Sequence, residues 1–233
     1  MENKTENTEK ILEEIRNNGI YYIDSFLSPE EVEGIREELL KFYNSISDGS
    51  QYCDSAPVQK NSYKTGKALV FLKQESIPYS NSIFERDFFK KLAFGYLGQG
   101  CQRNLQTFST YEYKVVEREE WPRNLFFHFD PYRALKFFFY LEDTDEENGA
   151  FRAIPGSHHQ CRSIREKTNI YTLLHEKYLV EQHPELSNLK EEDAKFFTGK
   201  AGTLLIFDTD IAHTGGILKK DGAKRMVILN HNR

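Results

Sequence analysis

The segment Phe127-His128-Phe129-Asp130 constrains the fold most, because it places two metal-ligating side chains two residues apart in an apolar run. Side chains at positions i and i+2 of a β-strand point to the same face of the sheet. We therefore expect His128 and Asp130 to converge while Phe129 turns into packing. Two ligands on one strand need a third ligand from elsewhere, and a barrel that brings it close.

Short strands are expected to account for most of the second half of the chain. The segments after Asn104 are rich in Thr, Phe, Tyr and Val, and turn-forming pairs such as Asn148-Gly149 and Asp221-Gly222 separate several of them. Many short strands after a helical first half favour a mainly β fold with supporting helices, as a β-sandwich or jelly-roll barrel. The expected strands are residues 105–116, 125–130, 134–141, 150–154, 202–207 and 225–231.

Residues 8–18 are predicted to form a short amphipathic helix near the start of the chain. They place Ile11, Leu12 and Ile15 on one face, which is the spacing of a helix that packs on a core. A brief strand is expected to follow at residues 21–23, where two tyrosines precede an isoleucine.

A second helix is expected to begin after Ser28. Pro29 stands at its first position and Glu31 at its third, which together with Ser28 is the pattern of a capping box. The helix should run to about residue 43, with four apolar side chains toward the core: Val32, Ile35, Leu39 and Phe42. Another helix is expected over residues 83–96.

Two long segments lack a clear hydrophobic period. Residues 45–82 contain Gly, Ser, Pro, Asn and Tyr, and are interpreted either as a surface loop or as a lid over a site. Residues 161–198 are interpreted as an insertion, with helical stretches around residues 170–180. This insertion is expected to be a surface excursion or a cap on the substrate side.

Length and charge limit the class of protein. The 233 residues are most simply one domain, with helical support and a variable loop over 1–103 and the β core over 104–231. The net charge is −5, and Lys and Arg are scattered rather than clustered. A nucleic-acid partner is therefore not expected.

The cysteines and the apolar runs indicate the compartment. Cys53, Cys101 and Cys161 are odd in number and widely spaced, which suits a reduced chain better than a disulfide framework. No run is long enough for a membrane span, and residues 1–10 lack the apolar core of a signal peptide. We expect a soluble, cytoplasmic protein with no membrane partner.

The third ligand is expected to be a histidine on a distant strand, because a facial arrangement needs another direction of approach. His213 is the best candidate, since the apolar segment 202–208 leads it into the core. Two histidines and one carboxylate on one face of an iron ion leave adjacent positions open for a co-substrate and dioxygen. Arg225 begins the last expected strand and could pair bidentately with a carboxylate of that co-substrate.

Taken in order, these residues resemble the phytanoyl-CoA dioxygenase family. The pattern consists of His128-Phe129-Asp130, the segment 148–158 (Asn-Gly-Ala-Phe-Arg-Ala-Ile-Pro-Gly-Ser-His), His213 and Arg225. The resemblance covers residues 104–231. It implies a double-stranded β-helix, which is a jelly-roll or cupin-like barrel, and a non-haem oxygenase that uses Fe(II), 2-oxoglutarate and dioxygen.

The resemblance also implies roles for single residues. His128, Asp130 and His213 would bind the iron, and Arg225 would hold the far carboxylate of 2-oxoglutarate. Phe138 falls where family members have an aromatic side chain that lines the co-substrate pocket. Related halogenases have a small residue in place of Asp130, so the carboxylate resembles the hydroxylating branch. Desaturation or ring formation would use the same ligands.

Three further positions bear on the co-substrate site. Phe129 and Gly215 stand where family members have polar groups near the co-substrate. Lys136 shares the strand parity of Phe138, so it faces the interior if Phe138 does, and a buried lysine needs an anionic partner. The hypothesis is that Lys136 contacts an anion of the substrate or co-substrate. The alternative is an edge position with its ammonium group in solvent.

The leading prediction is a non-haem Fe(II)- and 2-oxoglutarate-dependent dioxygenase that hydroxylates a small molecule, such as a sugar or a secondary-metabolite intermediate. The alternative is a non-catalytic metal-binding β-helix protein or a cupin-like metal-dependent isomerase. Arg225 discriminates between them, because the alternatives have no use for it.

Overall fold

Helices dominate the start of the chain and strands dominate its second half. The computed structural model describes residues 8–48, 50–53, 56–60, 66–121, 125–168, 178–220 and 222–233. Its α-helices are α1 (Thr8–Asn18), α2 (Pro29–Tyr43), α3 (Pro78–Phe84), α4 (Asp87–Leu97) and α5 (His158–Lys167). Its strands are β1 (Ile20–Ile23), β2 (Ser50–Cys53), β3 (Ala56–Lys60), β4 (Gly66–Leu72), β5 (Gln106–Glu112), β6 (Leu135–Tyr140), β7 (Phe151–Ala153), β8 (Lys195–Phe197), β9 (Leu204–Asp208), β10 (His213–Thr214) and β11 (Arg225–Asn232). Its short 3-10 helices are η1 (Gln74–Ser76), η2 (Arg118–Glu120), η4 (Val180–Gln182), η5 (Pro184–Leu186) and η6 (Glu191–Asp193).

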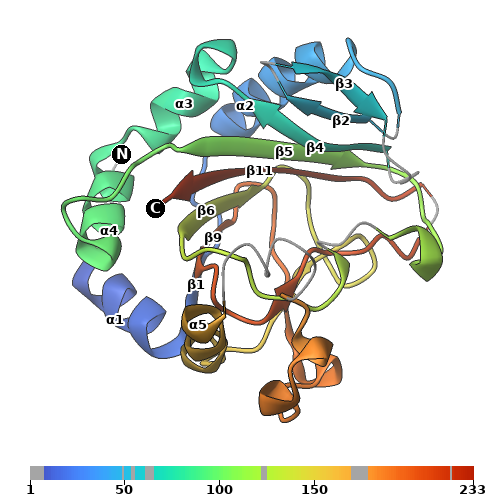
Figure 1. Cartoon of the computed structure of the whole chain (residues 1–233). Coiled ribbons are helices and arrows are strands. Elements are labelled where there is room, and N and C mark those ends of the chain that lie inside the picture. Colours follow the sequence, from blue (N-terminus) through green and yellow to red (C-terminus); the bar gives the residue numbers. More distant parts are fainter. Residues whose placement is uncertain are drawn as a thin grey trace.

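The strands form two sheets that pack against each other (Figure 1). The larger sheet has the order β1-β9-β6-β11-β5-β4-β2-β3, and the smaller sheet has the order β10-β7-β8. Phe138 and Phe207 of the larger sheet meet Phe151 of the smaller one in a shared apolar cluster. The fold is thus mainly β, with the two facing sheets of a double-stranded β-helix. Among the described residues no ladder joins the two sheets.

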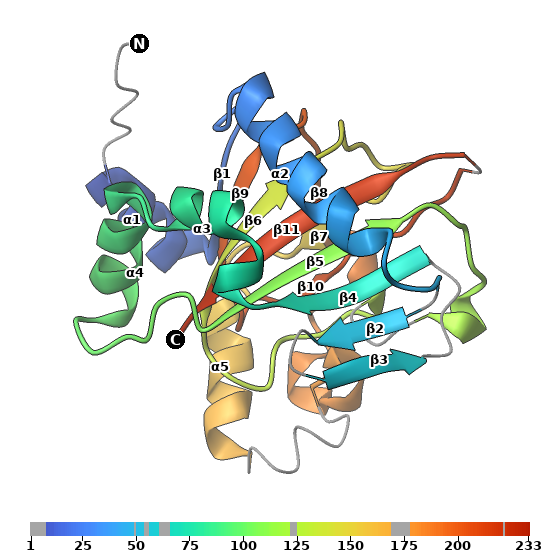
Figure 2. The ribbon, with the colours of Figure 1, turned by 90° about the horizontal axis from the view of Figure 1, so that it is seen from above.

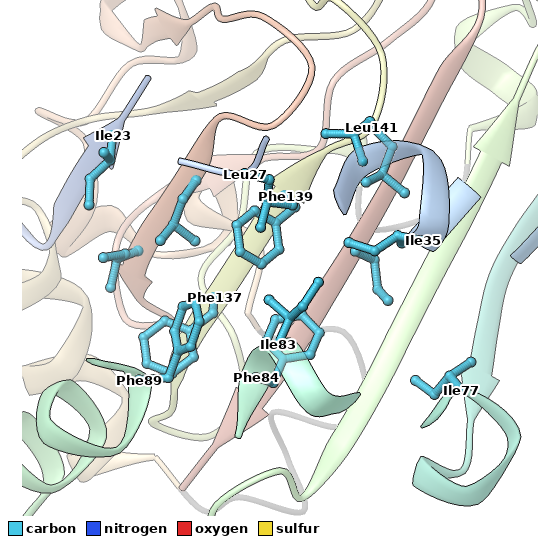
Figure 3. Close-up of a cluster of buried hydrophobic side chains, with 14 of the residues drawn as sticks. Ile23, Leu27, Ile35, Ile77, Ile83, Phe84, Phe89, Phe137, Phe139 and Leu141 are labelled. Atoms are coloured by element: carbon cyan, nitrogen blue, oxygen red, sulfur yellow. The ribbon is translucent and has the colours of Figure 1, made fainter. Parts of the chain in front are cut away.

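The other face of the larger sheet is covered by α1 to α4 (Figure 2). Strand side chains alternate between faces, so Phe137 and Phe139 of β6 point toward the helices while Phe138 points toward the smaller sheet. Figure 3 shows Phe89 of α4 and Phe84 of α3 packed on this face, with the Phe89 ring centroid 4.8 Å from that of Phe137. The helical layer supports the sheet from behind and leaves its opposite face free to carry a site.

Helix α2 begins and ends as its sequence indicates. Val32, Ile35 and Leu39 are buried, and both hydrogen bonds of the capping box are present. The structure differs from the prediction at the last turn. Phe42 was expected to face the core, but Tyr43 is fully buried there and Phe42 only partly. The reason is a hydrogen bond between the hydroxyl groups of Tyr43 and Ser109 on β5, which draws the tyrosine into the core.

Replacing Ser28 with alanine should lower the free energy of unfolding by about 1 kcal/mol. Ser28 Oγ accepts a hydrogen bond from Glu31 N at 3.3 Å, and the Glu31 carboxylate accepts one from Ser28 N at 2.9 Å. Urea denaturation would measure the loss. Ser45→Ala is the control, because the exposed Ser45 hydroxyl donates only to Phe42 O. Equal losses in the two variants would contradict the capping argument.

The first hundred residues contribute more to the sheet than expected. Residues 45–82 were interpreted as one loop or lid, but their described parts contain β2, β3 and β4, which extend the larger sheet beyond β5. This interpretation was wrong because pairing with a neighbouring strand, and not a strong local period, stabilises these strands. The division into helical support before residue 104 and β core after it therefore does not hold for this sheet.

The helix expected over residues 83–96 is two helices. Helix α3 starts earlier, with Pro78 in its first turn, and it ends at Phe84. Arg86 then adopts an extended backbone with ψ of 148°, which interrupts the helix before α4. The apolar period continues across this break because both helices pack on the same sheet face.

Two expectations for the second half also change. Residues 125–130 form no regular strand, and His128 instead makes single bridges to Leu179 and His213. The proposed insertion at 161–198 begins within α5, and its end supplies β8, which pairs with β7 in the smaller sheet. Most of the helical stretch expected around residues 170–180 lies outside the described residues. Within those residues, no helix is both long enough and apolar enough to cross a membrane.

Candidate metal centre

Three side chains predicted as ligands meet in one buried cluster. The ligand atoms of His128, Asp130 and His213 all lie within 4.8 Å of one another. Asp130 Oδ1 lies 3.5 Å from His128 Nε2 and 3.8 Å from His213 Nε2. Two ligand atoms about 2.1 Å from one ion and at right angles lie about 3 Å apart, so small side-chain movements would bring these atoms onto one metal. Two nitrogens and a carboxylate oxygen also fit the donor set of non-haem Fe(II) sites.

Backbone pairing brings the two histidines together. His128 N donates to His213 O at 2.8 Å, and His213 N donates to His128 O at 2.7 Å. Residues paired in this way are direct cross-strand neighbours, so their side chains lie on the same face. Asp130 is held beside them because its N–H donates to Thr209 O at 2.9 Å. Segments 80 residues apart are thereby joined through the main chain.

Backbone carbonyls orient both imidazole rings. His128 Nδ1 lies 2.7 Å from Phe126 O, and His213 Nδ1 lies 2.7 Å from Ile211 O. A carbonyl oxygen can only accept, so each neutral ring carries its proton on Nδ1 and keeps a lone pair on Nε2. Burial and the neighbouring His128 lower the pKa of His213 to about 3, which keeps that ring neutral. Both Nε2 atoms are therefore available to a metal.

Lys136 forms an ion pair with the carboxylate of the cluster. Its Nζ lies 2.6 Å from Asp130 Oδ2, and its side chain is only 12% exposed. Burial would raise the pKa of Asp130, but Lys136 and the two neighbouring histidines hold that pKa well below its ordinary value. Lys136 therefore faces the interior, as its parity with Phe138 indicated. The anionic partner that the structure gives it is Asp130, whose Oδ1 remains directed at the histidines.

Buried ion pairs anchor the loop that carries His213. Asp208 ends β9 and Asp210 follows it before β10, and both are fully buried. Arg162 of α5 donates to Asp208 at 2.7 Å and to Asp210 at 2.9 Å, and Arg165 donates to Asp210 at 2.6 Å. Helix α5 therefore holds this loop, and with it the position of His213.

The cluster opens into a cavity of about 220 Å³ between the two sheets. Alternate residues of β11 and β6 line its floor, because these residues share the face opposite the helices. Lys136 and Gly215 also line it, whereas Phe129 is fully buried in a separate apolar cluster. Most of the wall is apolar: Phe108, Phe138, Phe151, Phe207, Val227 and Leu229. A cavity with apolar walls and a few convergent polar groups is typical of a small-molecule site.

Arg225 lines the same cavity, and part of its guanidinium group is already hydrogen-bonded to neighbouring protein groups. Its Nε donates to Gly149 O and its Nη1 to Glu112 Oε2, both at 2.8 Å. Its Nη2 takes part in no hydrogen bond among the described residues. Gly149 has φ of +96°, and a Cβ there would lie 2.6 Å from Arg225 Cδ, so this approach requires glycine. The Phe138 ring, predicted to line the pocket, has its centroid 5.8 Å from Arg225 Cζ.

Residues 178–180, in the middle of the insertion, contact the cluster. Phe129 N donates to Tyr178 O, and Val180 N donates to Phe127 O, each at 3.1 Å. The Tyr178 ring lies 5.7 Å from that of His128, centroid to centroid. The segment 178–180 is therefore in contact with the cluster. It belongs to the insertion that was expected to be a surface excursion or a cap on the substrate side.

Two residues at this site were missed in the sequence. Glu112 is the direct cross-strand neighbour of Arg225, a relation that depends on the register between β5 and β11. The second is His231, which is buried and lines the cavity. The sequence could have indicated this position, because His231 and Arg225 are an even number of residues apart on the last strand and so face the same side.

A double-stranded β-helix with a cluster of two histidines and one carboxylate defines the class of non-haem iron oxygenases. The model of the phytanoyl-CoA dioxygenase (PhyH) family matches residues 15–226, and the chain belongs to this family. The match confirms the resemblance and extends it into the first hundred residues. No curated protein sequence matches the chain.

Solved structures with the same fold include the three proteins described next. The 2-oxoglutarate-dependent carbocyclase SnoK from nogalamycin biosynthesis has 14% identity and a TM-score of 0.64, with 96% of this chain and 83% of that chain covered. EctD from S. alaskensis has 14% identity and a TM-score of 0.63, with 100% and 78% covered. AviO1 from Streptomyces viridochromogenes Tue57 has 15% identity and a TM-score of 0.62, with 99% and 96% covered.

Iron and 2-oxoglutarate, the cofactors expected from the sequence, are present in solved structures of EctD. One EctD structure contains 2-oxoglutarate and 5-hydroxyectoine, and another contains bound Fe. In the present chain, the described residues contain one cluster of three side chains with the geometry to hold such a metal.

Proposed function

We propose that this protein is an Fe(II)- and 2-oxoglutarate-dependent dioxygenase that hydroxylates a small molecule. The observation that carries the proposal is that His128, Asp130, His213 and Arg225 line one cavity. A metal cluster alone would serve metal storage or isomerisation. An arginine fork in the same cavity adds a position where a carboxylate ligand can bind beside the metal.

The cluster residues would hold the iron, which, with 2-oxoglutarate bound, supplies activation of dioxygen for attack on a substrate C–H bond. The protein contributes orientation. The bonds from each histidine Nδ1 to a carbonyl hold the two Nε2 atoms in place. Lys136 binds Asp130 Oδ2, so the carboxylate presents Oδ1 and leaves the remaining positions to co-substrate and dioxygen.

Arg225 would receive the far carboxylate of 2-oxoglutarate. Glu112 and the Gly149 carbonyl fix the plane of the guanidinium group before the co-substrate arrives. A group fixed in advance loses little side-chain entropy on binding. Phe138 would pack along the carbon chain of the co-substrate, since its ring lies beside Arg225 in the cavity.

The cavity favours a small substrate, for which we propose a sugar or a secondary-metabolite intermediate. Aromatic walls suit a ring-shaped molecule and exclude water from the reacting atoms. Asp130 supports hydroxylation over halogenation, because the carboxylate takes the position that a halide would need. That one neighbour, SnoK, is a carbocyclase of nogalamycin biosynthesis supports a secondary-metabolite substrate.

Removing the guanidinium group of Arg225 should weaken 2-oxoglutarate binding. Because a lone Arg225→Met change would leave Glu112 buried without its partner, the variant to use is Arg225→Met with Glu112→Gln. Loss of charged hydrogen bonds should raise the Kd of 2-oxoglutarate about 10- to 100-fold, with Fe(II) affinity unchanged. The visible charge-transfer band of the anaerobic Fe(II)–2-oxoglutarate complex measures this Kd.

Arg152→Met is the matched control for this experiment. Arg152 is partly buried and, like Arg225, is paired with a glutamate, Glu191, but it does not line the cavity. Its variant should bind 2-oxoglutarate like the unmodified protein. If the unmodified protein showed no charge-transfer band with Fe(II) and 2-oxoglutarate, the proposed function would be refuted. An unchanged Kd in the double variant would refute the role of Arg225 alone.

A further inference from the structure

The cavity extends past the metal cluster to a second polar group, His231. Arg225 and His231 are six residues apart on β11, and both line the cavity together with the alternate residues between them. Six residues of a strand span about 20 Å, so the two side chains mark opposite ends of the cavity. Under the proposed function, 2-oxoglutarate occupies the Arg225 end. The His231 end is left for the substrate.

His231 has no hydrogen-bond partner for either ring nitrogen among the described residues. Its residue is only 3% exposed. Of the described side chains that line the cavity, only that of His231 has buried polar atoms without a hydrogen-bond partner. Buried polar groups are nearly always hydrogen-bonded, so an unpartnered imidazole that lines a cavity indicates a ligand with hydrogen-bonding groups of its own.

The surroundings of His231 specify what kind of group it would bind. Burial and the nearby Lys136 lower the pKa of His231 well below its ordinary value, against the opposing effect of Asp130. A neutral imidazole offers one N–H donor and one acceptor nitrogen. A hydroxyl group can both donate and accept, so a pair of hydroxyls matches this ring, whereas a carboxylate or phosphate cannot donate to its acceptor nitrogen.

The charges of the site also favour an uncharged substrate. Lys136 is paired with Asp130, and Arg225 is paired with Glu112. A bound metal dication and the 2-oxoglutarate dianion would balance each other as well. The described residues that line the cavity then leave no positive charge in excess to hold an anionic group.

Aromatic rings flank His231 on two sides. The centroid of the Phe108 ring lies 4.6 Å from that of His231, and the centroid of the Tyr132 ring lies 6.2 Å away. Such rings offer flat apolar surfaces on which the C–H face of a saturated ring can pack while its hydroxyls reach the imidazole.

We propose that His231 binds hydroxyl groups of a neutral, ring-shaped polyhydroxy substrate at the end of the cavity opposite Arg225. This inference rests on the proposed function, whose substrate class it narrows. His231 is a substrate-binding residue, and it adds specificity for uncharged polyols over their acidic counterparts.

Binding of two matched sugars would test the proposal. The protein would be loaded with Zn(II), which has no redox chemistry, and with 2-oxoglutarate, so that no turnover occurs. Methyl β-D-glucopyranoside and methyl β-D-glucuronide differ only in a carboxylate, and myo-inositol serves as a second neutral probe. The readout is the ring nitrogen resonances of labelled histidine, with His231 assigned by their loss in His231→Phe.

The neutral probes should shift the His231 resonances saturably, and the glucuronide should bind at least about tenfold more weakly. His231→Phe should lose about tenfold in affinity for the neutral probes and none for 2-oxoglutarate. It should also keep the unfolding temperature of the unmodified protein, because no hydrogen bond among the described residues is lost and the larger phenyl ring can extend into the cavity. His159→Phe, at an exposed position outside the cavity, should bind every probe normally.

Three results would overturn the proposal. The first is no saturable shift by either neutral probe up to about 100 mM, where even a millimolar ligand saturates. The second is tighter binding of the glucuronide, and the third is unchanged affinity in His231→Phe. Failure of the proposed function would look different, because 2-oxoglutarate would then form no charge-transfer complex with Fe(II), while the sugar titration would still report on His231.

Discussion

Asp130→Ala is expected to have the largest effect on the metal centre. The variant should lose Fe(II) binding, because it removes the only carboxylate of the three-residue cluster. The metal-free variant should also be less stable by about 3 kcal/mol, since Lys136 is left as a mostly buried charge without its partner at 2.6 Å. Urea denaturation of the metal-free protein measures the stability, and anaerobic Fe(II) titration measures the affinity.

A double variant separates these two effects. Adding Lys136→Met to Asp130→Ala removes the unpaired charge, so most of the lost stability should return while Fe(II) binding remains absent. If the double variant stayed as unstable as the single one, the Lys136–Asp130 pair would not be the source of the loss. If Asp130→Ala bound Fe(II) within about tenfold of the unmodified protein, Asp130 would not be a ligand.

Asp210→Asn should cause the largest loss of stability away from the metal ligands. Asp210 is fully buried and accepts from Arg162 at 2.9 Å and from Arg165 at 2.6 Å. Asparagine keeps the shape but removes the charge, which leaves the arginines of α5 in excess over Asp208. Removing one partner of a buried pair costs about 3–5 kcal/mol, and the partial exposure of both arginines places the expected value at the lower end.

Asp143→Asn provides the matched control for the loop network. Asp143 pairs with Lys200 at 2.7 Å, but both side chains are mostly exposed. Its loss should leave the urea midpoint nearly unchanged, because exposed ion pairs contribute little. Similar destabilisation in both variants would contradict the role of α5 in anchoring the loop. In folded Asp210→Asn protein, a weaker Fe(II) affinity would show that this anchor also positions His213.

Local patterns predicted several elements well, for reasons that lie within a few residues. The capping box fixes the start of α2, because Ser28 and Glu31 satisfy each other's backbone groups without help from the rest of the chain. Strands β6, β9 and β11 lie within one or two residues of their expected bounds, since apolar β-rich runs bounded by turns leave few alternatives.

Non-local pairing limited the other predictions. Strands β2 to β4 owe their form to the edge of β5, so the composition of residues 45–82 does not reveal them. The expected strand at 125–130 reduces to single bridges that join His128 to Leu179 and to His213, and neither bridge extends into a ladder.

The sequence by itself determined the family and which residues should converge, because parity along a strand and the order of the ligand motifs are properties of the chain. It indicated His128, Asp130, His213 and Arg225 for this reason. Only the tertiary structure decided what each of these groups faces. Register set Glu112 against Arg225, and the crossing of distant segments set Lys136 against Asp130. The packing of β11 also left His231 buried without a hydrogen-bond partner among the described residues, because hydrogen bonding inside a fold depends on which distant atoms come within reach.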